Sequence, residues 1–369
     1  MNIETEITSL LKQTITQKNK QKRMHLFREI FSLNEFSNFF EGKDYNYLIK
    51  DYYTPQDYLY SKKESKKAQN IFLNTFHLER SYHQYFSSCT ISNYYETPLK
   101  QCHFYFKETL SKQKFISIII DFFKTELPEF YPYFLNLLNE NQIIYLKEKD
   151  YLEKESIGLT KYLPTSKKSY IFIPLEYTLK NMITLVHEVG HTIHFNFIKD
   201  DYLSFANNYF SEIISYFFEQ IFLNYLIKNN LFKEECNRYL NSLAILLYNK
   251  ANHLYIISNI NFTVDNLYNI TTQSTEIYEQ IKEHLNDNFD IYKLQNLNLR
   301  KTLLYYYGIL FSYELLEQYK INRSETLKNI KNILCNKNIE NLEDILEYIN
   351  LDIESIASHK TLQKQIHPF

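Results

Sequence analysis

Residues 184–194 read Thr-Leu-Val-His-Glu-Val-Gly-His-Thr-Ile-His, and within this stretch His187, Glu188 and His191 form the pattern H-E-x-x-H. Residues four apart lie on one face of an α-helix, about a turn from each other, so both imidazoles can reach one Zn²⁺ ion. Glu188 lies roughly 100° further round the helix, where it can accept a proton from a water at the metal without occupying a ligand position. The stretch therefore predicts a helix that carries a metal site.

The flanking residues also favour a helix. Thr178 suits the N-cap position, and apolar residues then recur at helical spacing, namely Met182, Leu185, Val186, Val189 and Ile193. The five-residue pattern is short enough to occur by chance on an ordinary helix, so a third ligand must decide between the two interpretations. A third histidine six residues after the second is typical of metzincins, but this position holds Phe197.

A second helical segment supplies a candidate third ligand. Glu212, Ser215 and Glu219 are spaced i, i+3 and i+7, so they share one face of a helix that is otherwise rich in Ile, Tyr and Phe. Carboxylates on an apolar surface require a partner, and a metal ion with its histidines is a suitable one. We predict Glu212 as the third ligand and interpret Asp200 and Asp201 as loop residues.

With these two segments, the sequence resembles the thimet oligopeptidase and oligoendopeptidase F family of gluzincin-type zinc peptidases. Residues 184–194 match the family pattern T-L-x-H-E-x-G-H-x-x-H, and residues 212–219 match E-x-x-S-x-x-x-E. A third segment, residues 306–312, is similar to the family helix Y-Y-G-Y-L-W-S, and the resemblance extends over about residues 155–320. It implies a mostly α-helical, zincin-type metallopeptidase with a small β-sheet beside the active-site helix.

The resemblance also implies roles for further residues. In the family, tyrosines of the third segment hydrogen-bond the scissile carbonyl as it becomes an oxyanion, which points to Tyr306 with Tyr305 or Tyr307 as alternatives in register. Ser215 and Glu219 are expected to orient the histidine ligands through hydrogen bonds. The run Tyr170–Ile173 resembles the edge strand that pairs with the peptide substrate.

The chain departs from the family pattern in three respects. Family members are usually much longer, so the N-terminal helical lobe is expected to be reduced. The tyrosine expected after Gly308 is Ile309, and no histidine stands shortly before Tyr305. His194 falls on the same helix face as His187, where it is either a group near the metal or substrate or a buried core histidine.

Composition excludes several other classes. The chain of 369 residues has only four glycines, at positions 42, 158, 190 and 308, and contains no G-x-G-x-x-G or P-loop pattern, which argues against dinucleotide-binding sheets and P-loop enzymes. The bias towards Ile, Asn, Lys, Tyr and Phe is typical of an AT-rich genome. Gly190 and Gly308 nevertheless lie within two of the motifs, in predicted helices where glycine is unfavourable, so we expect close approach of other groups there.

Charge and hydrophobicity limit the partners. A net charge of -2 provides no basic surface for nucleic acid or for a membrane, and no segment is long and apolar enough to span a bilayer. The N-terminal residues are polar and do not resemble a secretory signal. The four cysteines are widely spaced, which favours free thiols. We therefore expect a cytoplasmic protein, and its oligomeric state stays open.

Helical periodicity covers most of the chain, with expected breaks at Pro55, Pro98, Pro128 and Pro132. Residues 1–110 are predicted to form the N-terminal helical lobe and residues 111–369 the catalytic region. The helical periodicity is lost at about residues 140–175, where the alternating run Tyr170–Ile173 and Gly158 predict two or three strands.

The sequence thus favours a zinc-dependent oligopeptidase with one Zn²⁺ per chain, in which Glu188 is the general base. Its substrate would be a short peptide. Two alternatives stay open: a dedicated protease that removes a leader from a precursor peptide, and a non-catalytic relative that only binds peptides or zinc. An intact Glu188 weighs against the last, because a binding protein does not need the base.

Overall fold

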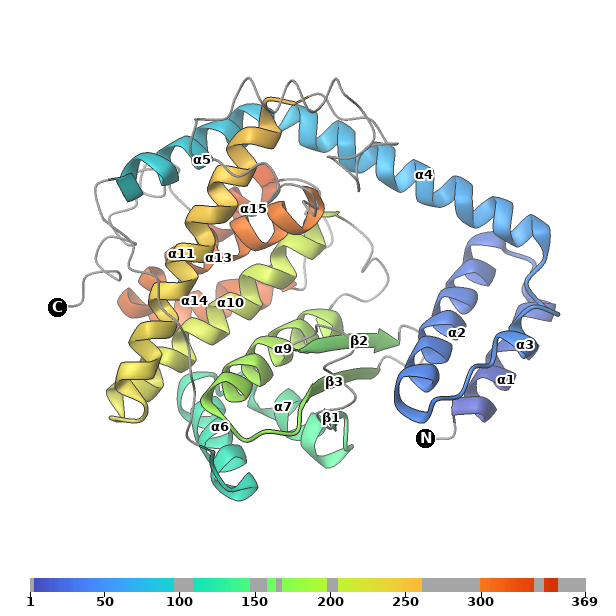
Figure 1. The fold of residues 1–369 in the computed structure, drawn as a ribbon, viewed down its shortest axis with the longest axis horizontal. Coiled ribbons are helices and arrows are strands. Elements are labelled where there is room, and N and C mark those ends of the chain that lie inside the picture. Colours follow the sequence, from blue (N-terminus) through green and yellow to red (C-terminus); the bar gives the residue numbers. More distant parts are fainter. Residues whose placement is uncertain are drawn as a thin grey trace.

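The computed structural model describes residues 3–95, 109–146, 158–163, 168–197, 205–260, 299–334 and 342–350. Most of these residues lie in helices, which surround one small sheet (Figure 1). The prediction of a mostly α fold with a small β-sheet is confirmed. The helices of residues 3–139 are α1 (Ile3–Thr16), α2 (Lys20–Glu41), α3 (Asn46–Ile49), α4 (Pro55–Leu78), α5 (Arg80–Tyr95), α6 (Lys112–Glu126) and α7 (Tyr131–Asn139). The later helices are α9 (Leu179–Phe197), α10 (Phe205–Lys228), α11 (Lys233–Ser258), α13 (Leu299–Ile321), α14 (Arg323–Leu334) and α15 (Leu342–Ile349).

The sheet has three strands in the order β1-β3-β2: β1 (Ile143–Leu146), β2 (Leu159–Leu163) and β3 (Lys168–Pro174). β1 pairs with β3 in parallel, and β2 pairs with it antiparallel, with Thr160 opposite Ile171. The segment Tyr170–Ile173 is therefore central, which corrects its prediction as the edge strand. Alternating apolar residues at that point mark a strand, but they do not reveal how many neighbours it has.

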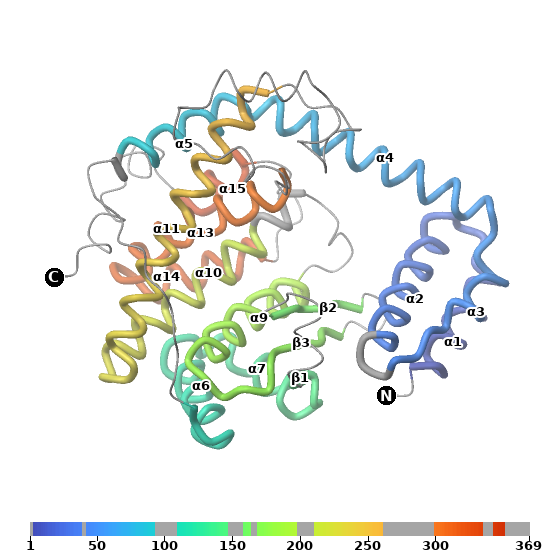
Figure 2. The backbone as a smooth tube through the Cα atoms, in the orientation of Figure 1, coloured from blue at the N-terminus to red at the C-terminus, as the bar shows by residue number. Residues whose placement is uncertain are grey.

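Helix α9 begins where the sequence predicts it. The hydroxyl of Thr178 accepts a hydrogen bond from the backbone N–H of Asn181 at 3.3 Å, as an N-cap side chain does. The apolar residues after the cap are buried, including Met182, Leu185 and Val189. α9 packs against β2 and β3 on one side and against α10 on the other, so the H-E-x-x-H pattern lies between the sheet and a second helix (Figure 2).

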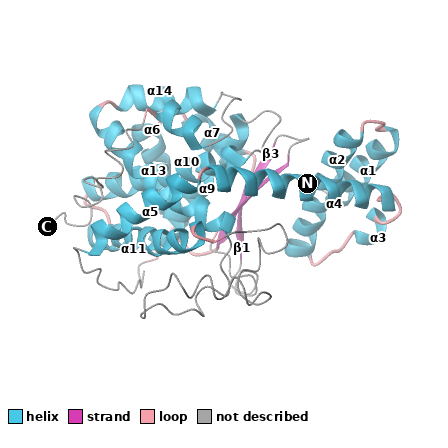
Figure 3. Ribbon diagram, turned by 90° about the horizontal axis from the view of Figure 1, so that it is seen from above, coloured by secondary structure: helices cyan, strands magenta, loops and turns pink. Residues whose placement is uncertain are grey.

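The first three helices have a small core of their own, in which Ile7, Leu11, Phe27 and Ile30 are buried. This core also includes Leu163 at the end of β2, so the sheet lies between the N-terminal helices and the larger helical body (Figure 3). α4 leads from one part to the other. Its middle section, residues 61–70, has no buried side chain, which is typical of a helix that bridges two parts of a chain through solvent.

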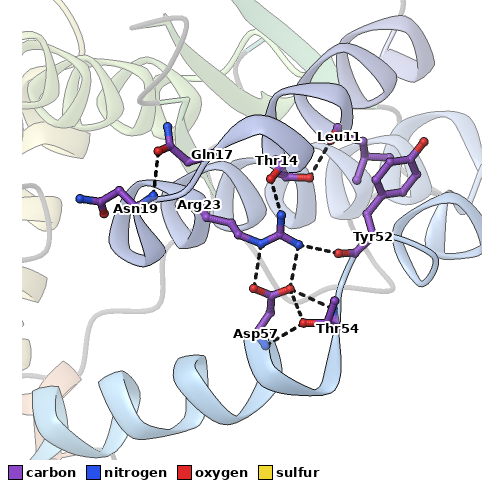
Figure 4. A network of polar contacts seen from close by, with 8 residues as sticks. All are labelled: Leu11, Thr14, Gln17, Asn19, Arg23, Tyr52, Thr54 and Asp57. Carbon is purple, nitrogen blue, oxygen red and sulfur yellow. Dashed lines mark hydrogen bonds and ion pairs between the residues drawn. The ribbon is translucent and has the colours of Figure 1, made fainter.

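Arg23 holds the N-terminal helices together (Figure 4). Its guanidinium donates to both carboxylate oxygens of Asp57 at 2.9 Å, and also to the backbone carbonyls of Tyr52 and Thr14. Asp57 in turn accepts from the backbone N–H of Thr54, in a capping box that begins α4 at Pro55. Pro55, predicted as a break, is thus the first residue of a helix.

The larger core contains apolar residues from the end of α4 through α15, including Phe76 and Phe86 before residue 110. Apolar contacts join α5 to α11 and α13 rather than to α1–α3, so the larger core begins before residue 110. The division of the chain at residue 110 stays a prediction. Among the residues described, no helix has both the length and the apolar character needed to cross a membrane.

Candidate metal centre

Helices α9 and α10 bring His187, His191 and Glu212 together as a group that could hold a metal ion, with one ligand atom of each within 4.8 Å of the others. Nε2 of His187 lies 3.6 Å from Oε2 of Glu212, and Nε2 of His191 lies 3.7 Å from Oε1 of the same carboxylate. The two imidazole rings are nearly perpendicular, with centroids 4.9 Å apart. Two nitrogens and a carboxylate therefore converge on one point, as in zinc sites that leave a fourth position open.

The other ring nitrogens of the histidines have partners on α10. Nδ1 of His187 donates to Oε2 of Glu219 at 3.1 Å, and Nδ1 of His191 pairs with the hydroxyl of Ser211 at 2.7 Å. These bonds orient both rings so that each Nε2 faces the carboxylate of Glu212. Tyr239 of α11 hydrogen-bonds to Glu219 and so extends the support of His187.

Ser215 does not have the orienting role that was predicted for it. Its hydroxyl is buried without a hydrogen-bond partner among the described residues, and its backbone lies against Gly190. Ser211, one turn earlier on α10, contacts His191 instead. Two serines four residues apart face the same side of a helix, so their spacing alone does not show which one reaches the imidazole.

Glu188 lies beside the cluster and is held by the sheet. The hydroxyl of Thr160 on β2 donates to Oε2 of Glu188 at 2.6 Å. Gly158 lies next to this contact, where a Cβ atom would come within 2.8 Å of Oε1 of Glu188 and 2.4 Å of the Thr184 methyl group. Neither Thr160 nor Gly158 was predicted as a site residue, because no local pattern indicates that a strand some 28 residues before Glu188 reaches it.

Burial and charge act together on the ionisable groups. Burial lowers the pKa of His187, but its hydrogen bond to Glu219 and the charges of Glu219, Glu212 and Glu188 outweigh this and raise it to about 9. Burial raises the pKa of Glu188, against the opposing effects of His187 and the Thr160 hydrogen bond. Burial also raises the pKa of Glu212, to about 7, with His187 opposing the shift and the other two carboxylates adding to it. The site therefore groups three buried carboxyl groups beside His187.

These groups fit a divalent cation. Oε2 of Glu212 is buried and has no hydrogen-bond partner among the described residues, although a buried carboxylate oxygen requires one. Burial and the charges of His187 and His194 lower the pKa of His191 well below its usual value, so this imidazole is neutral and can act as a ligand. Two imidazoles and a carboxylate are the donor types that zinc prefers.

Gly190 and Gly308 mark close contacts around the cluster, as the sequence indicated. A Cβ atom on Gly190 would lie 2.6 Å from Cα of Ser215, so glycine lets α9 approach α10. A Cβ atom on Gly308 would lie 2.8 Å from Cβ of Glu212, so a second glycine lets α13 approach the same helix. Both contacts lie within one turn of a predicted metal ligand on α9 or α10.

The structure does not bring Tyr306 to the cluster. Its side chain is buried against α5, where its hydroxyl pairs with Thr90 at 2.7 Å, and the hydroxyl of Tyr307 pairs with Nδ1 of His83 at 2.6 Å. Tyr305 faces the site: burial and the charges of Glu212 and Glu188 raise its pKa to about 12. Of the three tyrosines that the resemblance offered, Tyr305 is thus the one on the side of the cluster, because it shares a helix face with Gly308, which packs on Glu212.

His194 is a buried histidine next to the cluster. Burial lowers its pKa to about 3, so it is neutral, and its ring lies beside those of Phe195 and Phe210. Its Nδ1 has no hydrogen-bond partner among the described residues. These surroundings agree with the core interpretation. The interpretation as a group that contacts the substrate stays a prediction.

Comparison with known proteins gives matches among solved structures. No protein-family model matches the chain, and no curated protein matches it. A protein from Chlamydophila abortus described as a peptidase has a TM-score of 0.50 at 16% identity, over 82% of this chain and 55% of that one. An oligoendopeptidase F from Bacillus anthracis has a TM-score of 0.47 at 14% identity, over 80% of this chain and 54% of that one. PZ peptidase A, solved with an inhibitor, has a TM-score of 0.45 at 14% identity, over 80% of this chain and 56% of that one.

At identities this low, the likeness to the Chlamydophila abortus protein concerns the fold. The chain spans about half the length of the solved structures that it matches. The likeness therefore supports a mostly helical fold with a small sheet, whereas the chemistry must be argued from the residues of this chain.

Proposed function

We propose that the protein is a zinc-dependent peptidase that hydrolyses peptide bonds in short peptides, with one Zn²⁺ per chain held by His187, His191 and Glu212. The observation that carries this proposal is the convergence of these three donors beside a fourth group, Glu188, that is held in place but is not a ligand. A structural zinc site would use four protein ligands, whereas this donor set leaves one position open.

When bound, zinc would supply a Lewis acid that polarises a carbonyl and makes water more acidic. Glu188 takes the proton from the attacking water and delivers it to the leaving amine. Its pKa, raised by burial, suits this exchange, because a carboxylate with a raised pKa is a better proton acceptor. Thr160 keeps Oε2 of Glu188 fixed through its 2.6 Å hydrogen bond.

The free edge of β2 is the proposed binding surface for the peptide. Among the described strands, β2 pairs only with β3, so its other edge can add an extended chain. Thr160 and Tyr162 point to the same side of β2, where they contact Glu188 and Phe195 of α9. A peptide added at this edge would therefore lie along α9 near the base. Main-chain hydrogen bonds to β2 would bind it with little sequence selectivity.

Tyr305 is the proposed oxyanion donor. The electrostatic effect of Glu212 and Glu188 on its phenol supports a position near the reacting carbonyl. Because burial and these carboxylates keep the phenol protonated, it can donate a hydrogen bond to negative charge that develops on the substrate.

The experiment that tests this function combines metal analysis with two substitutions. The purified protein should contain about one zinc per chain and cleave short peptides. Glu188→Gln should retain zinc and lose most of the activity, because it removes the base but no ligand. Glu212→Ala should lose zinc. Cleavage by Glu188→Gln at the wild-type rate would contradict the mechanism, and unchanged zinc affinity of Glu212→Ala would indicate a different ligand.

The breadth of the activity is a separate question. A general cytoplasmic oligopeptidase would cut many peptides in a library, whereas a dedicated processing protease would cut few, and a non-catalytic relative none. Mass spectrometry of a peptide-library digest distinguishes these outcomes. The open edge of β2 supports the general oligopeptidase, because main-chain pairing does not depend on side chains.

A further inference from the structure

Two aromatic rings continue the contact between β2 and α9 beyond the proposed base. The hydroxyl of Thr160 on β2 donates to the carboxylate of Glu188 at 2.6 Å and lies 3.2 Å from the backbone carbonyl of the same residue. Two residues further along β2, the ring of Tyr162 stacks on that of Phe195, with centroids 5.3 Å apart and planes inclined by 10°. The proposed hydrolysis does not require this pair of rings.

These two contacts fix the direction of β2 relative to α9. Phe195 follows Glu188 by two helical turns, or about 10.5 Å, and Tyr162 follows Thr160 by about 6.6 Å of strand. β2 and α9 therefore run side by side in the same direction (Figure 1). An extended peptide that pairs with the edge of β2 facing away from β3 passes Glu188 at one point and the two rings at another.

The two rings can accept a further side chain. Tyr162 and Phe195 both remain partly exposed, although they cover part of each other. On β3 the residue opposite Tyr162 is Ser169, whose small side chain covers little of the ring. Residues opposite each other on adjacent strands place their side chains on one face of the sheet, with Cβ atoms about 4.5–5.5 Å apart. A peptide residue opposite Tyr162 would therefore lay its side chain against this ring.

The two faces of β2 differ in what they offer to a peptide. Lys161 lies between Thr160 and Tyr162 and points to the other face, where its Nζ lies 3.5 Å from the carboxylate of Glu35 on α2. Leu163, on the same face as Lys161, is buried in the core of the first helices. That face packs on the N-terminal helices and carries a charge, whereas the face towards α9 combines the proposed base with apolar surface.

We infer that Tyr162 and Phe195 form an aromatic subsite, which binds an aromatic or other large apolar side chain of the peptide substrate. The inference rests on the proposed peptidase function and names its substrate class. The substrates are short peptides with such a side chain two residues from the residue that lies opposite Thr160, because residues two apart share one face of a strand. Main-chain pairing with β2 gives affinity for any peptide, and this one position adds selectivity.

Binding to the zinc-loaded Glu188→Gln protein tests the inference without cleavage of the probe. The probes are a fluorescent heptapeptide of alanine and serine and three variants of it, with phenylalanine at position 3, 4 or 5. We expect phenylalanine to tighten binding about fivefold, the upper end of what one aromatic cross-strand pair contributes relative to alanine. The wild-type protein should cut all three variants at the same distance from the phenylalanine, and the side on which it cuts gives the direction of the peptide.

Substitutions then assign the preference to the two rings. Tyr162→Thr removes one ring but keeps a residue suited to a strand, so it should bind the phenylalanine and alanine peptides equally. Phe195→Ala removes the other ring without altering β2 and should weaken the preference. Tyr162→Phe should retain it. Tyr145→Thr, which removes a half-buried tyrosine from the opposite edge strand β1, is the matched control and should also retain it.

Two results would overturn the inference: equal affinity of the unsubstituted rings for phenylalanine and alanine peptides, or a preference that survives in both Tyr162→Thr and Phe195→Ala. Cleavage by the wild-type protein is measured separately with the same peptides. Equal binding with rapid cleavage of all peptides leaves the peptidase function intact and removes only the aromatic subsite. A preference that depends on Tyr162, without any cleavage, does the reverse.

Discussion

Replacement of Gly190 by alanine tests the contact that holds the two helices of the metal centre together. A Cβ atom at this position would lie 2.6 Å from Cα, 2.8 Å from Oγ and 3.1 Å from the backbone N of Ser215. Two of these three atoms belong to the backbone, so a new rotamer of Ser215 cannot relieve the overlap. Carbon atoms normally approach no closer than about 3.5 Å, so α9 and α10 would have to separate by about 1 Å.

The expected cost follows from this displacement. Overpacking of a buried contact costs about 1–3 kcal/mol, and alanine recovers about 1 kcal/mol of helix propensity, so we expect the free energy of unfolding to fall by at most about 2 kcal/mol. The effect on the affinity for zinc should be larger than the effect on stability. Separation of the helices lengthens the Nε2–carboxylate distances between His187 or His191 and Glu212, now 3.6 Å and 3.7 Å. We expect the dissociation constant for zinc to rise about ten- to a hundredfold, comparable with the loss of an outer-shell contact.

Competition with a chromophoric chelator measures the zinc affinity, and urea denaturation measures the stability. Gly42→Ala is a suitable control, because Gly42 has a φ of +64° and nothing lies within 4 Å of its added Cβ. It should lower stability by about 1 kcal/mol through backbone strain and leave zinc affinity unchanged. If Gly190→Ala binds zinc as tightly as the wild type, the close contact between α9 and α10 does not hold the cluster, and the reasoning fails.

Two further perturbations test the tyrosine register and the buried carboxyl of Glu79 between α4 and α5. Tyr305→Phe should lower kcat about a hundredfold with little change in KM. Tyr306→Phe should mainly lower the free energy of unfolding, by about 1 kcal/mol, because it loses the hydrogen bond to Thr90. Steady-state kinetics and thermal melts of both variants measure these effects, and a larger loss of kcat in Tyr306→Phe would restore Tyr306 as the donor. Burial raises the pKa of Glu79 to about 7, so the folded protein keeps a proton that the unfolded chain releases near pH 4.5. The contribution of Glu79 to stability is therefore fully present below pH 4.5 and disappears as the pH rises through about 7. Glu79→Gln should therefore remove up to about 3 kcal/mol of pH dependence between pH 4.5 and 8 in urea denaturation, and parallel curves for wild type and variant would contradict it.

Local patterns were sufficient to predict the helices of the site. The spacing of His187 and His191, the apolar residues around them and the cap at Thr178 all depend on the geometry of a single helix, and α9 begins accordingly. The face shared by Glu212 and Glu219 is another helical regularity, and the structure brings both carboxylates to the histidines. Each of these predictions concerns residues of a single helix.

Predictions that required two elements to be placed relative to each other were less successful. Three consecutive tyrosines point in directions about 100° apart, and only the packing of Gly308 against α10 selects Tyr305 for the site. The choice between Ser211 and Ser215 depends on the depth at which α9 lies against α10. The family resemblance placed the edge strand at Tyr170–Ile173, yet pairing on both sides makes this strand central.

The sequence by itself determined which residues can bind a metal and which helices carry them, because ligand chemistry and helical periodicity are local properties. It also indicated, through glycines retained in helices, where elements must approach closely. Only the tertiary structure decided which groups lie around the cluster: Thr160 on Glu188, Ser211 on His191, and Tyr305 rather than Tyr306. These choices depend on the packing of a strand and three helices far apart in the chain, and no local pattern in the sequence encodes that arrangement.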